Sequence, residues 1–182
     1  MAYQSFKQKK TKSGFNADEV VSALQKEIRR GNVESACYFG LELLESGLEF
    51  EQKFWKRMVV ISVEDINDDS VIPIIKTLKD NYADLQHAKE WDKGMQGLRA
   101  IKILCEAKKG RIISELYDLL SLKRKEGFKL EIPDYALDMH TEAGRAKGRG
   151  VKHFLEVAAK VINTTEKIDD KISKELLKKV IN

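Results

Sequence analysis

Apolar residues recur at helical spacing along most of the chain, beginning with residues 14–32, which read GFNADEVVSALQKEIRRGN. Asn16 stands before the first apolar position as a helix cap, Glu19 occupies the capping-box position, and Gly31 supplies the stop. The apolar stripe between them consists of Val20, Val21, Leu24 and Ile28. This pattern predicts an amphipathic helix with one buried face.

Of the next two segments, the first has a clear helical pattern and the second is compatible with a helix or a strand. Residues 32–47, NVESACYFGLELLESG, have Asn32 as a cap and Gly47 as a stop, which predicts a second helix antiparallel to the first. Residues 50–66 space Phe54 and Met58 as a helix would, yet the run MVVISV is also typical of a buried strand. We favour a helix, because no partner strand is visible elsewhere in the sequence.

The remaining segments are also helical in spacing. Asp69 is placed to cap a helix whose first turn tolerates Pro73, and Pro133 is placed to begin another. Further helices are expected over residues 70–86, 89–110, 111–127, 134–147, 151–162 and 169–182. The sequence therefore predicts an all-α fold, a single compact domain of eight or nine helices.

The predicted organisation has three parts. Residues 1–14 form a flexible basic arm, residues 15–163 the helical domain, and residues 164–182 a polar helical tail. Composition fits this picture, with 42% hydrophobic and 34% charged residues and two prolines among 182 residues. No apolar run approaches the length that crosses a bilayer, and the N-terminus is unlike a signal peptide, so we expect a cytoplasmic protein without a membrane partner.

The two cysteines, Cys37 and Cys105, lie inside apolar periodic segments. This placement predicts small buried core residues in a reducing compartment, with neither a disulfide nor a metal site.

The net charge of +4 is unevenly distributed. Residues 1–13 contain four of the 33 basic residues and no acid, so the rest of the chain carries 29 charges of each sign. These four are Lys7, Lys9, Lys10 and Lys12. Such an arm is suited to phosphate backbones, although a solvated terminus explains it equally simply.

Within the body, residues 42–69 hold eight acids and three bases, whereas residues 99–129 hold nine bases and four acids. Opposed patches on a neutral body favour self-association between an acidic face and a basic face. Neutralisation within one molecule is the alternative.

Residues 138–154, DMHTEAGRAKGRGVKHF, concentrate the candidate chemistry. Arg145, Lys147, Arg149 and Lys152 surround three glycines, where backbone amides can approach a phosphate, but no aromatic residue interleaves them for base stacking. The stretch lacks a phosphate-loop signature, and no catalytic or cofactor-binding constellation is recognisable in the chain. The main expectation is a glycine corner between two helices, with phosphate contact second.

On the predicted helix 134–147, Asp138 and His140 point about 200° apart at two residues' separation, so they cannot chelate a metal together. Asp134, Asp138 and Glu142 share one face, which is typical of a solvated, charge-laced helix.

Further expectations concern how this corner is held together. Met139 and Phe154 are expected to be buried, with Asp138 paired to Arg145 or Arg149, or across the corner to Lys152 or His153. The cations at 145, 147 and 149 are expected to stay exposed.

Several segments resemble the C-terminal helical region of the MgsA/RarA family, the AAA+ ATPases called replication-associated recombination proteins. The paired helices of residues 20–47 are similar to that family's, and SVEDI, with Ser62, Glu64 and Asp65, is similar to its Ser-Glu-Asp-Ile-Gly signature. CEAKKGRIISELY, with Lys109 and Tyr117, resembles its Ala-Pro-Lys-Ser-Asn-x-x-Tyr element without the proline. The segment EIPDYALDMHTEAGRAKGRGVKHF takes the place of the family's Val-Pro-x-x-Leu segment and glycine-rich tail.

This resemblance spans about residues 17–160 and lacks the family's ATPase module. It implies a homo-oligomer, usually a tetramer, that serves DNA replication, recombination or repair beside a separate AAA+ motor subunit. Three hypotheses follow: a non-catalytic oligomerisation module, a sequence-nonspecific nucleic-acid-binding protein using Lys7–Lys12 and Arg145–Lys152, and an enzyme using Asp138 and His140.

Overall fold

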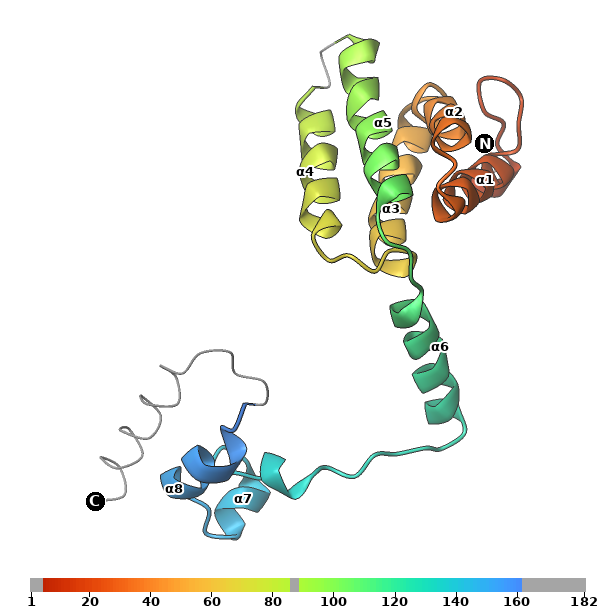
Figure 1. Ribbon diagram of the computed structural model, residues 1–182. Coiled ribbons are helices and arrows are strands. Elements are labelled where there is room, and N and C mark those ends of the chain that lie inside the picture. The colour runs from red at the N-terminus through yellow and green to blue at the C-terminus, as the bar shows by residue number, and fades with distance from the viewer. Residues whose placement is uncertain (1–4, 86–88, 162–182) are drawn as a thin grey trace. The chain divides into compact units, whose positions relative to one another are not determined.

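The computed structural model describes residues 5–85 and 89–161, and within them every regular element is helical (Figure 1). The prediction of an all-α fold is thereby confirmed. The chain forms two compact units, Met1–Lys125 and Glu126–Asn182, in place of the single domain predicted for residues 15–163. In the described part of the chain, no helix is long and apolar enough to cross a membrane.

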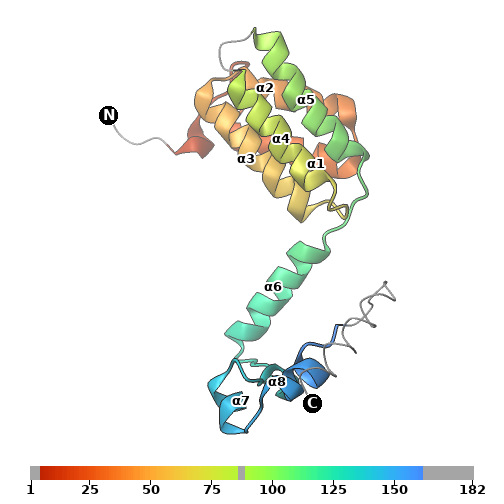
Figure 2. The same cartoon turned by 90° about the vertical axis from the view of Figure 1, so that its left-hand side faces the viewer.

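Unit 1 is built on five packed helices (Figures 1 and 2). They are α1 (Ala17–Arg30), α2 (Val33–Leu44), α3 (Leu48–Glu64), α4 (Val71–Asp84) and α5 (Glu90–Glu106). The α1 and α2 helices form the expected pair, and α5 packs against both α2 and α4. The core buries the apolar stripe of α1 together with large side chains from α3 and α5, among them Phe54, Met58, Ile61, Ile101 and Leu104. The run MVVISV lies within α3, so the helical interpretation is confirmed.

Small residues allow α2 and α5 to approach closely. A Cβ atom on Gly40 would lie 2.3 Å from Cδ1 of Ile101, and one on Gly97 would lie 2.6 Å from Cδ1 of Leu44. Each glycine therefore makes room for a large side chain of the opposite helix, which brings the two backbones together. Gly31 ends α1 in the left-handed conformation, with φ of 76°, as predicted from its position.

The helix starts differ in detail from the predicted caps. Asn16 and Asn32 occupy the N-cap positions of α1 and α2, but neither side chain caps its helix. Asn16 Oδ1 instead accepts a hydrogen bond from Lys10 Nζ at 2.7 Å. Ser70, not Asp69, is the N-cap residue of α4.

Residues 5–16 differ from the flexible arm that the sequence predicts, because they pack on the helical body. The Phe6 ring lies 5.1 Å from the Phe50 ring, and the amide of Ala17 donates to the carbonyl of Lys9 at 3.0 Å. Ser13 donates to the carboxylate of Glu42 through both its amide and its hydroxyl, each at 2.8 Å. The basic segment is therefore held against the acidic stretch that begins at residue 42.

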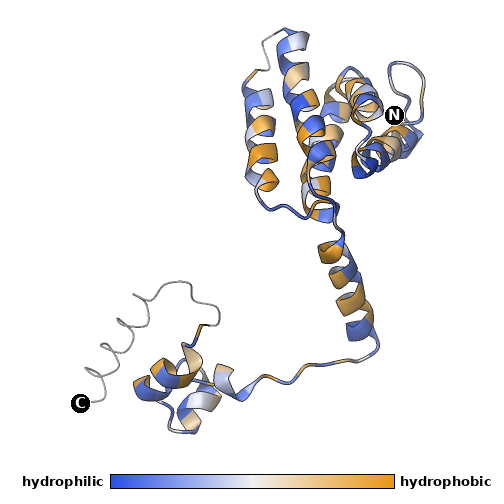
Figure 3. Cartoon of the chain, viewed as in Figure 1, coloured by the Kyte–Doolittle hydropathy of each residue, from blue (hydrophilic) through white to orange (hydrophobic). Residues whose placement is uncertain are grey.

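After α5, the chain continues into α6 (Ile112–Lys125), none of whose residues is buried. Its main neighbour among the helices is α3. Apolar and polar colours follow each other along α6 in Figure 3, and its last turn is basic. Unlike α1–α5, this helix buries no residue within the described part of the chain.

Unit 2 contains short helices and irregular turns. A 3₁₀ turn at Asp134–Ala136 precedes α7 (Glu142–Ala146), and α8 (Val151–His153) continues into a π-helical turn at Phe154–Ala158. The single helix predicted over residues 134–147 is therefore wrong, since residues 137–141 are not helical. The predicted tail, residues 164–182, lies outside the described residues.

Candidate functional site

A buried carboxylate, Asp65, joins three parts of unit 1. It stands at the end of α3, and its exposed fraction is 0%. Arg29 of α1 donates to it twice, from Nε at 2.9 Å and from Nη2 at 3.1 Å, and Gln25 Nε2 donates to Oδ2 at 2.8 Å. A buried charge requires such compensation, so the Asp65 side chain fixes α1 against the end of α3.

The segment between α5 and α6 is attached to the same place. The amide of Gly110 donates to the backbone carbonyl of Asp65 at 3.0 Å, and the amide of Asn67 donates to the carbonyl of Lys108 at 2.8 Å. Arg111 lies near both acids of the motif, with Nε 3.6 Å from Asp65 Oδ1 and Nη2 3.7 Å from Glu64 Oε1. The residue that precedes α6 is thus held by the end of α3.

Lys109 closes the last turn of α5. Its ammonium donates to the carbonyl oxygens of Leu104, Cys105 and Ala107, the last two at 2.8 and 3.1 Å. Carbonyls at a helix C-terminus lack partners within the helix and carry partial negative charge, which a cation satisfies. We call Asp65, Glu64, Lys109, Arg29 and Arg111 the α3–α6 junction.

The junction contains most of the residues that carry the family resemblance. Ser62 is buried one turn earlier on α3, where its hydroxyl donates to the Val59 carbonyl at 2.8 Å. Tyr117 does not belong to the junction, because it lies on α6 with 72% of its surface exposed. Glu64 and Asp65 hold the residues before α6, and Lys109 satisfies the end of α5, so these three motif residues position the start of α6.

The corner in unit 2 is built around Asp138. Its carboxylate accepts the backbone amide of His140 at 3.0 Å and lies 2.9 Å from Nδ1 of the same residue. These hydrogen bonds from His140, the side chain first, lower the pKa of Asp138. Thr141 then caps α7, since its hydroxyl accepts the amide of Gly144 at 3.0 Å and donates to the Asp138 carbonyl at 3.0 Å.

The predicted divergence of Asp138 and His140 is therefore wrong, as is the predicted pairing of Asp138 with Arg145, Arg149, Lys152 or His153. Both expectations assumed a continuous helix, whereas the turn at 138–141 folds the histidine back onto the carboxylate. An aspartate that orients an imidazole is also found in acid–base catalysis. Here the same carboxylate also receives the histidine's own amide, which is the geometry of a turn.

Two arginines satisfy backbone carbonyls inside the corner. Arg149 Nη1 donates to the carbonyls of Asp134 and Leu137, both at 2.7 Å, and Arg145 Nη1 donates to that of His140 at 3.1 Å. Lys147 and Arg149 both pair with the Asp134 carboxylate, at 2.7 and 2.5 Å. Arg145 and Lys147 are exposed, as predicted, whereas Arg149 is half-buried, and all three are engaged within the corner.

The two apolar residues of the corner, Met139 and Phe154, are half-buried. The Phe154 ring lies edge-on to the His140 ring at 5.0 Å, which closes one side of the turn. His153 is also half-buried, and its Nδ1 has no hydrogen-bond partner in the described part of the chain.

The lysines of the N-terminal segment are also engaged. Lys9 pairs with Glu49, and Lys12 pairs with Glu45 at 3.0 Å. Among the seven cations that the sequence identifies for phosphate contact, Lys152 is the one for which the described residues offer no partner. Lys9, Lys12, Lys147 and Arg149 thus pair with acids of their own chain.

Within residues 5–85 and 89–161, no group of three or more histidine, cysteine or acidic side chains could hold a metal ion. Cys105 is buried, as predicted, whereas Cys37 is only half-buried, and both carry free thiols. Burial raises the pKa of the Cys105 thiol to about 11, so it is a thiol at neutral pH.

The most conspicuous surface was not identified as a site from the sequence. The seven large apolar residues of α6 are between 42% and 72% exposed. They are Ile112, Ile113, Leu116, Tyr117, Leu119, Leu120 and Leu122. The sequence predicts a short amphipathic helix here, ended by Gly127, but its spacing does not show whether the apolar face is covered. We call these seven residues the α6 surface.

Neither protein-family models nor curated proteins give a match to this sequence.

The α3–α6 junction predicts a large effect of replacing Asp65 by asparagine. The substitution keeps the shape but removes the charge that compensates Arg29, and we expect the free energy of unfolding to fall by about 3 kcal/mol. Urea denaturation followed by circular dichroism measures this difference. Asp18→Asn, an exposed position on α1, is the control and should change stability by less than about 0.5 kcal/mol. Equal effects of both substitutions would contradict the assignment.

The corner predicts opposite outcomes for two glycines. A Cβ atom on Gly144 would lie 1.8 Å from the backbone oxygen of Asp138, so Gly144→Ala should disorder residues 134–158. At Gly150 no atom lies within 4 Å of an added Cβ and φ is −110°, so Gly150→Ala should be tolerated. Two-dimensional NMR of both variants tests this prediction. Native-like chemical-shift dispersion of residues 134–158 in Gly144→Ala would contradict it.

The corner also predicts a low titration point for Asp134. Hydrogen bonds from Lys147 and Arg149 lower the pKa of Asp134 to about 2. Because folding lowers this pKa, the stabilisation is complete above the unfolded value of about 3.9 and is lost as the pH falls towards 2. Carbon-detected NMR of the Asp134 carboxyl measures the titration. A midpoint near the ordinary value would show that these ion pairs are not formed.

Proposed function

We propose that this protein is a non-catalytic assembly module that self-associates through the α6 surface. The observation that supports this proposal most directly is the exposure of seven large apolar side chains on one 14-residue helix. Soluble proteins seldom leave so large an apolar patch uncovered unless it binds a partner. The occupant we propose is α6 of a second copy.

The arrangement of the α6 surface suits a helix partner. At about 100° per residue, six of its seven side chains fall within an arc of about 160°. The six are Ile112, Ile113, Leu116, Tyr117, Leu119 and Leu120. A face of this width matches the stripe that amphipathic helices bury when they pair.

The free energy available is sufficient for association. Complete burial of a large apolar side chain contributes about 1.5–3 kcal/mol, and these side chains are already about half covered. Covering one α6 surface therefore gains roughly 5–10 kcal/mol, and covering two gains roughly 10–20 kcal/mol. The entropic cost of association is about 4–15 kcal/mol, which leaves a net gain in the range of a reversible, concentration-dependent dimer.

Charge along α6 favours an antiparallel pair. Glu115 lies in its first turn and Asp118 near its middle, whereas Lys123, Arg124 and Lys125 occupy its last turn. A two-fold axis across the middle of the helix would bring the acidic half of one copy beside the basic end of the other. Parallel pairing would place like charges together.

The family resemblance suggests the setting of this assembly. It implies work in DNA replication, recombination or repair, in the cytoplasm, beside a separate AAA+ motor subunit that would supply ATP hydrolysis. It also implies tetramers, and a two-fold α6 contact joins only two chains, so a tetramer would need a second interface. The engaged state of the basic segments favours assembly over nucleic-acid binding as the function.

The proposal predicts that charges placed on the α6 surface prevent association. For Leu116→Glu/Leu120→Glu we expect a monomer at concentrations where the natural chain is oligomeric, with a dissociation constant raised roughly 100-fold or more. Sedimentation equilibrium over a range of concentrations measures this constant.

The matched control is Ile74→Glu on α4, which is also about two-fifths exposed but lies outside the α6 surface. It should associate as the natural chain does. A natural chain that is monomeric at high concentration would refute the proposal, and so would equal weakening by both variants.

A further inference from the structure

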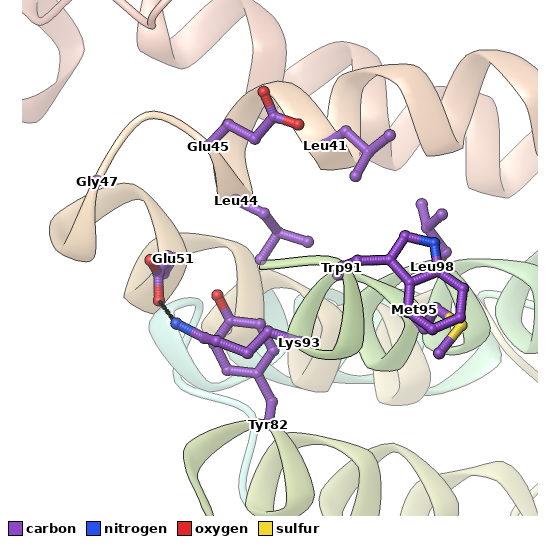
Figure 4. Close-up of a pocket in the computed structure, with 11 residues that line it drawn as sticks. Leu41, Leu44, Glu45, Gly47, Glu51, Tyr82, Trp91, Lys93, Met95 and Leu98 are labelled. Carbon is purple, nitrogen blue, oxygen red and sulfur yellow. Dashed lines mark hydrogen bonds and ion pairs between the residues drawn. The ribbon is translucent and has the colours of Figure 1, made fainter. Parts of the chain in front are cut away.

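Two adjoining hollows form a groove on unit 1, between the ends of α2 and α4 and the faces of α3 and α5. The first has a volume of about 530 Å³ and is shown in Figure 4. Its apolar wall consists of Leu41, Leu44, Trp91, Met95 and Leu98. Trp91 is 71% exposed, although exposed tryptophan is costly in water, so this wall is open to a ligand.

The second hollow, of about 420 Å³, shares Glu51, Tyr82 and Lys93 with the first. At this shared centre, Lys93 Nζ lies 3.4 Å from Glu51 Oε2 and 4.8 Å from the centre of the Tyr82 ring (Figure 4). The ion pair therefore neutralises this centre. The centre lies between the apolar first hollow and the second hollow, whose lining includes two further lysines.

The second hollow is positively charged at its outer edge. Lys56 of α3 and Lys79 of α4 line it, both are exposed, and the described residues offer neither of them an acid. Further cations lie close by on the same side of α3. Burial lowers the pKa of Lys53, and the neighbouring charges of Arg57, Lys56 and Lys7 lower it further. This edge thus holds positive charge that the described residues do not neutralise.

The side chain of Trp55 also lines the second hollow. Its indole Nε1 is fully covered and has no acceptor in the described part of the chain, so this donor is not open to a ligand in the hollow. An apolar hollow that continues into a cationic one has the chemistry of a site for an apolar group followed by an anion.

We propose that this groove binds a short acidic segment of a partner protein, with one large apolar side chain in the first hollow and carboxylates against Lys56 and Lys79. Charge complementarity selects this occupant, because residues 5–85 and 89–161 provide no acid for the cations Lys56 and Lys79 at the edge. A nucleic acid is a poorer match, because the apolar wall of the first hollow suits a single large apolar side chain better than a phosphate backbone. The proposal does not depend on self-association through α6.

The test uses a fluorescein-labelled peptide, Asp-Glu-Phe-Asp-Glu, whose binding to the full chain is followed by fluorescence anisotropy at low salt. We expect a dissociation constant of roughly 10–100 μM, and at least about tenfold weaker binding of Asp-Glu-Ser-Asp-Glu, which lacks the apolar anchor. Trp91 emission should shift on binding of the unlabelled peptide, because its ring lines the first hollow.

Two substitutions locate the site. Lys79→Glu should weaken binding of the phenylalanine peptide about tenfold or more, and Lys26→Glu, an exposed control of the same charge change on α1, should leave it within about twofold. Circular dichroism melting confirms that both variants fold.

Three results would overturn the proposal. They are equal binding of the two peptides, equal effects of the two lysine substitutions, and tighter binding of single-stranded oligothymidine than of the peptide with the same loss in Lys79→Glu. The last result would assign the cationic edge to nucleic acid.

Discussion

The buried carboxylate of Asp65 is the constraint on which the arrangement of unit 1 depends. A charge with 0% exposure is tolerated only where donors surround it, and here those donors come from α1. The backbone carbonyl of the same residue accepts a hydrogen bond from the amide of Gly110, so the segment that follows α5 is held at the same point. One residue thus determines both how α1 meets α3 and where α6 begins, and α6 carries the surface that we propose for assembly.

Unit 2 achieves order by a different physical route. Up to residue 161, its large apolar side chains are half-buried or exposed, and its turns are stabilised by hydrogen bonds from side chains to backbone carbonyls. Arg149 and Arg145 replace the partners that a longer helix would have provided for those carbonyls. The close approach of Gly144 to Asp138 then sets the path of the chain. Residue types that suggested phosphate chemistry are therefore accounted for by the polar framework of a small unit.

The helices of unit 1 could be predicted from the sequence because their apolar stripes and glycine stops are local signals. Val20, Leu24 and Ile28 are buried as their spacing requires, and Gly31 ends α1 in the left-handed conformation. The corner could not be predicted in this way. Helical spacing placed Asp138 and His140 apart, whereas a side-chain hydrogen bond two residues away favours a turn over a helix.

Contacts between residues far apart in the sequence could not be predicted from local sequence patterns either. The ion pairs of Lys9 and Lys12 join residues more than thirty positions apart, so a basic segment that reads as a free arm is neutralised by Glu49 and Glu45. The α6 pattern correctly indicated an apolar face, but no local signal shows whether that face is covered by the same chain. The groove beside Trp91 likewise depends on four helices that only the fold brings together.

Amide hydrogen–deuterium exchange of α6, measured at several protein concentrations, tests the central claim most directly. If α6 is covered by a second copy, its amides should exchange slowly in concentrated protein and approach unprotected rates on dilution, while α1–α5 stay protected throughout. Protection of α6 that is strong and independent of concentration would mean that its own chain covers it. That result would contradict assembly through α6.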